Sequence, residues 1–125
     1  MPLLQKSDNL SKPWLKNYPK GVPHELGELQ YNSLVEMFEE SFQRFASRDA
    51  LKYFGKYFTY GMLDQLSQQF ASYLQTLELE HGTRIAIMMP NVPQFQISML
   101  GILRAGYVVV NVNPLYTARE LEFQL

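Results

Sequence analysis

The chain has 125 residues, of which 46% are hydrophobic and 14% aromatic, and its formal net charge is -1. This length allows one domain at most, the composition predicts a packed core, and the charge gives no electrostatic reason to expect nucleic acid. The lack of cysteine excludes disulfides, thiolate catalysis and cysteine-based metal sites. No apolar run reaches the ~18 residues that cross a bilayer, and residues 1–10 lack the apolar core of a signal peptide, so a soluble intracellular protein is expected.

Residues 1–30 are predicted to form an extended arm, because they hold four prolines and show no sustained hydrophobic periodicity. Four lysines and two aromatic residues lie close together in this arm: Lys6, Lys12, Lys16, Lys20, Trp14 and Tyr18. Cations and aromatic rings in this arrangement suit contact with a lipid surface. The interpretation we favour is that the two rings pin the arm to its own domain while the lysines stay in water.

Residues 31–125 are predicted to form an α/β subdomain that opens with a helix. Ser33 and Glu36 have the spacing of a capping box, and five apolar side chains follow on one face: Leu34, Val35, Phe38, Phe42 and Phe45. Residues 50–54 and 57–60 are then short aromatic-rich runs. Because Gly55 and Lys56 separate them, we expect an antiparallel hairpin with glycine first in its two-residue loop.

A second helix is predicted to follow, with Thr59 as its cap. Its buried stripe is expected to consist of Leu63, Leu66, Phe70 and Leu74. Its polar side chains are expected to face water: Asp64, Gln65, Gln68 and Gln69. Residues 77–83 then form a loop that leads to a strand.

Residues 84–116 carry the pattern of a parallel strand, a crossover helix and a second parallel strand. Residues 85–89 are an unbroken apolar run, as in a strand buried on both faces, and residues 107–112 are a second, β-branched run. The helix is predicted over residues 94–105, with Gly106 in the left-handed position beyond its end. A stripe of small residues would let this helix lie close to a sheet: Ser98, Gly101 and Ala105.

Thr117 and Glu120 predict another capping box and a further helix with which the sequence ends. Two parallel strands are few, since sheets usually have about four to six strands and parallel ones need cover on both faces. We therefore expect an incomplete subdomain, the first part of a longer α/β protein.

The candidate binding site lies at the strand ends. In open α/β sheets ligands bind beyond the carboxyl ends of the strands, which here means residues 90–94 and 113–116. Four residues gather there as candidates: Asn91, Asn111, Asn113 and Tyr116. The alternative is that Asn91 and Asn113 serve turns beside proline-containing segments.

Other chemistry has little support in the sequence. The seven glycines are scattered singly, so there is no glycine-rich phosphate loop. His24 and His81 are isolated and lack the spacing of metal ligands. Two pairs of acids have the composition used in acid-base catalysis, but their predicted positions on a polar helix face and in a loop favour a surface role: Glu39 with Glu40, and Glu78 with Glu80. The sequence therefore assigns no catalytic, cofactor-binding or metal-binding residue.

The strings TYGMLDQLSQQFASYLQ, RIAIMMPN and GILRAGYVVVNVNPLYTARELEFQL, in this order, resemble the start of an adenylate-forming acyl-CoA synthetase. Within that superfamily, KPWLKNYPKGVP and NVNPLYTARELEFQL most resemble the bacterial long-chain fatty-acid CoA ligases. The resemblance covers residues 12–125. One departure is Thr83, in a surface turn where the family usually has aspartate between the glycine and the arginine.

The resemblance implies the N-terminal part of the large domain of an AMP-binding ligase. Such enzymes convert a fatty acid, ATP and coenzyme A, with magnesium, into acyl-CoA, AMP and diphosphate. None of the family's catalytic motifs occurs in residues 1–125, so no catalytic residue can be carried over and the chain alone is expected to be inactive.

The resemblance also implies that the partners are the rest of the ligase chain and the substrates. It implies a cytoplasmic location. It leaves open both peripheral contact with the inner membrane and the formation of a homodimer. The alternative function is a freestanding, non-enzymatic interaction or oligomerisation module that pairs through exposed edge strands.

Overall fold

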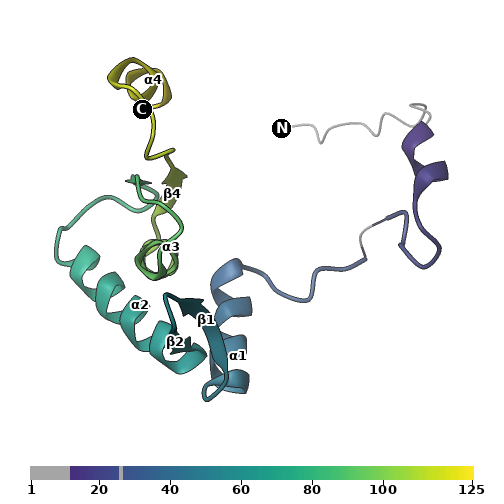
Figure 1. Cartoon of the computed structure of the whole chain (residues 1–125), viewed down its shortest axis with the longest axis horizontal. Helices are drawn as coiled ribbons and strands as arrows, with labels where there is room; N and C mark the ends of the chain where they lie inside the picture. The colour runs from purple at the N-terminus through teal and green to yellow at the C-terminus, as the bar shows by residue number, and fades with distance from the viewer. Residues whose placement is uncertain (1–11, 26) are drawn as a thin grey trace. The chain divides into compact units, whose positions relative to one another are not determined.

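The computed structural model describes residues 12–25 and 27–125, so Lys6 lies outside the described residues (Figure 1). The chain divides between Gln30 and Tyr31 into two units. The first contains the 3-10 helix η1 (Pro13–Asn17). The second contains, in order, α1 (Leu34–Phe45), β1 (Asp49–Tyr53), β2 (Lys56–Thr59), α2 (Tyr60–Gln75), β3 (Arg84–Ile87), α3 (Pro93–Arg104), β4 (Val108–Asn111) and α4 (Ala118–Gln124).

The first unit turns back on itself after η1. Lys12 Nζ lies 2.6 Å from Glu25 Oε1, and the ring of Tyr18 meets the edge of His24 with centroids 5.7 Å apart. The turn uses Gly21 at a φ of 91°, a conformation that glycine adopts without steric cost. The hydrogen bond and charge of Lys12 hold the pKa of Glu25 below its ordinary value.

The cap of α1 differs in part from the prediction. Ser33 Oγ accepts a hydrogen bond from the Glu36 N–H at 3.1 Å, as expected. The Glu36 carboxylate instead accepts from the N–H of Asn32 at 2.8 Å, one residue before the cap, so the reciprocal box is only half formed. Of the apolar side chains predicted to share one face, Phe42 is buried, whereas Leu34 is 57% exposed. It lies in the first turn, before the helix meets its partners.

The hairpin is confirmed as antiparallel, but its loop is shifted by one residue. Tyr53 pairs with Lys56, which leaves Phe54 and Gly55 as the loop, with φ of 44° and 79°. Positive φ at both loop residues is typical of a type I′ turn, whose twist matches that of the strands. Glycine is therefore second in the loop, and the prediction that it comes first was wrong.

Helices α2 and α3 pack closely against each other at Gly101. Thr59 caps α2 by accepting from the Met62 N–H, as expected. The expected contact between the small residues of α3 and the sheet is wrong for Gly101, because a Cβ placed there would lie 2.7 Å from Phe70 Cδ1 and 3.0 Å from the Ser67 carbonyl oxygen. Gly101 thus allows close approach of α3 to α2. Ser67 and Ala71 of α2 are buried together with Leu63 and Leu74, while Leu66 and Phe70 are half-buried.

Strands β3 and β4 are parallel and in register from Arg84 opposite Val108 to Ile87 opposite Asn111, with α3 as the crossover between them. Gly106 ends α3 at a φ of 83°. Its N–H donates to the Leu103 carbonyl, and the Tyr107 N–H donates to the Ile102 carbonyl. These two bonds form a Schellman motif, which confirms the predicted helix end.

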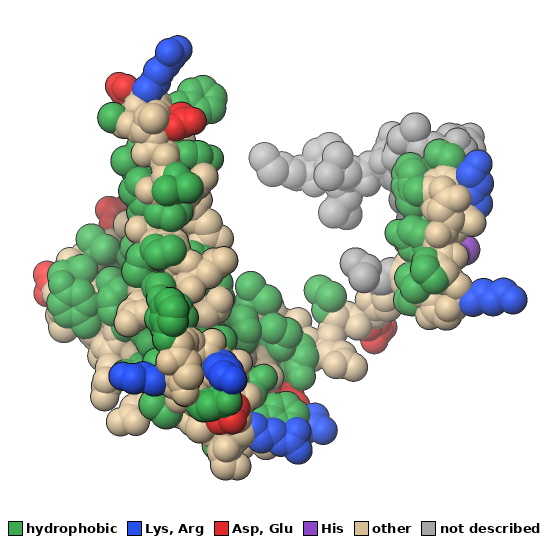
Figure 2. All heavy atoms as spheres, viewed as in Figure 1, with side chains coloured by type: hydrophobic (Ala, Val, Ile, Leu, Met, Phe, Trp, Pro, Cys, Tyr) green, Lys and Arg blue, Asp and Glu red, His purple; other side chains and the backbone are tan. Residues whose placement is uncertain are grey.

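Only one face of this strand pair is covered within the described part of the chain. Ile87 joins Leu74, Ile102 and Tyr107 in the core, but Ala86 and Val108 are exposed. The expectation that residues 85–89 are buried on both faces is therefore wrong here, because α2 and α3 cover one side and the two strands have no further layer. Hydrophobic side chains remain visible on the surface of this unit in Figure 2.

Candidate functional site

The carboxyl ends of β3 and β4 lie at one edge of the strand pair, since the strands are parallel. Beyond β4, Asn113 forms a turn: its Oδ1 accepts from the Leu115 N–H at 3.0 Å, and its carbonyl accepts from the Tyr116 N–H at 3.1 Å. The carbonyl of Asn111 accepts from Gln124 Nε2 at 2.8 Å, which ties α4 to the end of β4. Asn113 therefore has the turn role that the sequence left open.

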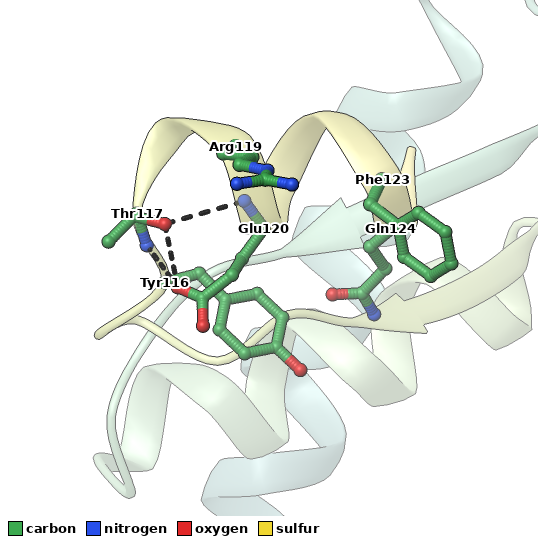
Figure 3. A pocket seen from close by; sticks show the side chains of 6 residues that line it. All are labelled: Tyr116, Thr117, Arg119, Glu120, Phe123 and Gln124. Atoms are coloured by element: carbon green, nitrogen blue, oxygen red, sulfur yellow. Dashed lines mark hydrogen bonds between the residues drawn. The ribbon is translucent and has the colours of Figure 1, made fainter.

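A hollow of about 830 Å³ lies beside α4 (Figure 3). It is lined by Tyr116, Thr117, Arg119, Glu120, Phe123 and Gln124. All six belong to one short helix and the residues that lead into it, so they form a single wall. The Phe123 side chain is 95% exposed, which shows how open the hollow is.

Two polar groups of this hollow are engaged in the cap of α4. The hydroxyl and the N–H of Thr117 both donate to Glu120 Oε2, at 2.7 and 2.8 Å, and the Glu120 N–H donates back to Thr117 Oγ1. The predicted capping box is thus confirmed. These hydrogen bonds from Thr117 favour the ionised carboxylate and hold the pKa of Glu120 below its ordinary value. Neither residue is arranged as a nucleophile with a base.

A second, smaller hollow of about 170 Å³ lies between β1 and the start of α3. It is lined by Leu51, Lys52, Tyr53, Asn91, Val92, Pro93 and Gln96. Asn91 therefore lines this hollow, whereas Tyr116 lines the first. The structure does not bring the four candidate residues into one site.

The sequence analysis missed a buried charged cluster around Arg104, whose side chain is only 8% exposed. Its guanidinium bonds the Asp64 carboxylate at 2.5 Å, the Asp64 carbonyl at 2.9 Å and Ser67 Oγ at 3.0 Å, and it stacks over the Phe42 ring at 5.1 Å. Asp64, which was expected to face water, is 31% exposed and is paired with Arg104. The available signal was that Arg104 is the one charged residue of α3. The contacts of Arg104 join α1, α2 and α3.

Glu39 and Glu40 make local contacts, whereas Glu80 contributes its backbone carbonyl, and not its carboxylate, to the loop before β3. Glu39 Oε1 lies 3.8 Å from Arg104, and a hydrogen bond to Glu40 raises the pKa of Tyr31. The Glu80 carbonyl accepts from the hydroxyl of Thr83 at 2.7 Å, which closes the loop before β3. No pair of carboxylates faces a shared pocket in residues 12–25 and 27–125.

The described residues contain no group of three histidine, aspartate or glutamate side chains that could hold a metal ion. His24 packs on Tyr18, and His81 lies against Gly106. In the same residues no helix is both long and apolar enough to span a membrane.

The fold is that of the N-terminal part of the large domain of adenylate-forming enzymes. The chain matches a structure of the NpsA N-terminal subdomain from Klebsiella oxytoca in complex with anthranilyl-AMSN, with a TM-score of 0.73 and 31% identity, over 77% of this chain and 25% of that one. The anthranilate CoA ligase AuaEII in complex with anthranoyl-AMP has the same fold at 21% identity, with a TM-score of 0.69 over 77% of this chain and 19% of that one.

The sequence model of the AMP-binding enzyme family matches residues 38–125, and the chain belongs to this family. It is 50% identical over 117 residues to a long-chain-fatty-acid--CoA ligase of Escherichia coli O157:H7, which covers 93% of this chain and 21% of the relative. A ligase of the same description from Bacillus subtilis is 43% identical over 114 residues, 91% of this chain and 20% of the relative. These matches confirm the family resemblance. The chain spans about a fifth of the length of these curated relatives.

Proposed function

We propose that the chain forms the N-terminal part of a long-chain fatty acid CoA ligase, which converts ATP, a fatty acid and CoA into acyl-CoA, AMP and diphosphate. The observation that carries this proposal is the 50% identity over 117 residues to ligases of that description. Sequence identity at this level supports a shared substrate class more strongly than fold alone does, because one fold hosts many functions.

The role of this stretch is structural. Its arm (residues 1–30) and incomplete subdomain (residues 31–125) supply the first strands and helices of the large domain, whereas ATP, magnesium and CoA bind to groups outside it. The ligase works in the cytoplasm, in peripheral contact with the inner membrane into which fatty acids partition. The isolated chain forms no acyl-adenylate.

A chimera tests this proposal. Residues 12–125 replace the aligned segment of the Escherichia coli ligase, and acyl-CoA formation from a long-chain fatty acid is measured with and without ATP. We expect ATP-dependent activity within about tenfold of the parent enzyme, a loss of no more than ~1.4 kcal/mol in transition-state stabilisation. The parent enzyme with the segment deleted is the inactive control. A chimera that melts cooperatively yet makes no acyl-CoA would contradict the proposal.

The second candidate is a freestanding interaction module, and the uncovered face of β3 and β4, with Met88 and Val108 exposed, favours it. The size of the native polypeptide separates the two functions. An immunoblot with intact-mass confirmation should show a species several times heavier than 14.6 kDa if the chain is part of a ligase. A native species of 14.6 kDa that self-associates would support the module.

A further inference from the structure

The tip of the β1–β2 hairpin presents aromatic side chains to solvent. Phe54 is 89% exposed and Tyr57 is 52% exposed. Phe54 also has a φ of 44°, in the left-handed region that bulky residues rarely occupy. Glycine, asparagine or aspartate would suit this turn position better. The backbone conformation of Phe54 is unfavourable for a large side chain, and its ring is not buried in a way that would offset this cost. Such a residue points to a role in binding.

The charged side chains of this hairpin tip are all positive. Residues 51–58 contain Lys52 and Lys56 and no acidic residue. Lys52 Nζ lies 5.0 Å from the centre of the Tyr57 ring, and the ring of Phe54 meets that of Tyr53 at 4.6 Å. The smaller hollow, which adjoins the hairpin through Lys52 and Tyr53, is also lined without any carboxylate.

We propose that the hairpin tip, residues 52–57, contacts the surface of an anionic lipid bilayer. In this arrangement Phe54 enters the boundary between headgroups and acyl chains, and the two lysines meet the lipid phosphates, with their apolar stems along the surface. Each lysine near an anionic surface adds attraction that salt weakens. The inference builds on the membrane contact in the proposed function, and it places that contact in the hairpin and not in the lysines of the arm.

Vesicle sedimentation of the full chain tests the proposal, with no ATP, CoA or fatty acid present. The probes are vesicles of phosphatidylcholine alone and of equal parts phosphatidylcholine and phosphatidylglycerol. We expect binding to the anionic vesicles that weakens as salt is raised. Phe54→Asn should weaken it roughly tenfold through loss of ring burial. Lys52→Gln and Lys56→Gln should weaken it about fivefold each.

Matched controls keep the result specific. Phe123→Asn removes an equally exposed ring from α4, and the pair Lys16→Gln and Lys20→Gln removes two cations from the arm; both should leave binding within about twofold. Asparagine tolerates positive φ, so Phe54→Asn should not lower the melting temperature, and weaker binding then cannot be ascribed to unfolding. The proposal is overturned if the chain does not bind anionic vesicles, or if the control variants weaken binding as much as the hairpin variants.

The same variants in the chimeric ligase separate this inference from the proposed function. We expect Phe54→Asn to weaken vesicle binding there too, with acyl-CoA formation from detergent-dispersed fatty acid unchanged. A chimera that binds vesicles through the hairpin but lacks activity would refute the ligase proposal and leave the hairpin contact standing. A chimera that is active, but whose vesicle binding is unchanged by Phe54→Asn, would support the ligase proposal and refute the hairpin contact. It would mean that another part of the longer protein covers the tip.

Discussion

Gly101 shows how one missing side chain sets the distance between α2 and α3. A Cβ at this position would lie 2.7 Å from Phe70 Cδ1 and 3.0 Å from the backbone oxygen of Ser67, so the Phe70 ring or the backbone of one helix would have to shift. We expect Gly101→Ala to lower the free energy of unfolding by about 1–2 kcal/mol, because overpacking outweighs the gain of up to ~1 kcal/mol in helix propensity. Urea unfolding measures this difference. Gly27→Ala is the matched control, since its Cβ would meet nothing within 4 Å; equal effects of the two changes would refute the argument.

Arg104 is the residue whose loss should damage the fold most directly. Removing it takes one donor from the Asp64 carboxylate, which still accepts from Gln68 Nε2, and one donor from Ser67 Oγ, which still donates to the Asp64 carbonyl. We expect Arg104→Ala to cost about 2–3 kcal/mol, below the usual loss for a fully buried pair because Asp64 is partly exposed to water. Arg44→Ala, which removes an exposed arginine stacked over Phe45, should cost less than ~0.5 kcal/mol. Equal decreases in melting temperature for both variants would show that the Arg104 cluster does not stabilise the packing of α1, α2 and α3.

At the scale of the element, the stability of α4 should depend on pH through its capping box. The pKa of Glu120 is lower in the folded chain than in the unfolded one. The stabilisation that the ionised carboxylate gives to the folded chain is therefore fully present above the ordinary pKa of about 4.3, and it is lost as the pH falls through the folded pKa. We expect the Glu120 carboxyl signal in NMR to titrate below that of an unstructured glutamate. Thr117→Val should move the titration up towards the ordinary value.

Thr83→Val serves as the control for that titration. It removes a hydroxyl that bonds only the Glu80 carbonyl, and it should leave the Glu120 titration where it was. An unchanged titration in Thr117→Val would instead mean that the cap does not set the pKa of Glu120.

Elements were predictable where their cause is local. Thr59, Thr117 and Gly106 act on backbone groups within five residues of themselves, so the sequence alone placed these helix ends correctly. The hairpin loop was misplaced by one residue because its register depends on which two residues take positive φ, and Phe54 is an improbable choice for that conformation. The partner of Gly101 was missed because a small residue marks a close approach without saying to what.

At the scale of the whole molecule, the sequence predicted the parallel strands correctly, but the residues expected to share a site at their carboxyl ends are not brought together. The carboxyl ends of the parallel strands were predicted correctly, yet Asn91 and Tyr116 line different hollows, and Asn113 is used in a turn. The hollow beside α4 is lined by that helix and by Tyr116 and Thr117, which lead into it, so it has one wall within the described residues. The same lack of a second layer explains why β3 and β4 are exposed on one face, contrary to the apolar pattern of their sequences.

Because β3 and β4 have apolar sequences but one exposed face, we predict that this face is covered in the longer ligase. Val108, 46% exposed here, belongs to an apolar run suited to burial. We expect Val108→Thr to change the free energy of unfolding of the 125-residue chain by less than ~0.5 kcal/mol, and that of the chimeric ligase by about 1–3 kcal/mol, because there the hydroxyl would be buried by further strands or helices. Ile87→Thr, on the core side of the same strand pair, should be costly in both proteins, at about 2 kcal/mol. Urea unfolding of the four variants decides the matter: a small effect of Val108→Thr in both proteins would mean that this face stays open to water, as the interaction module requires.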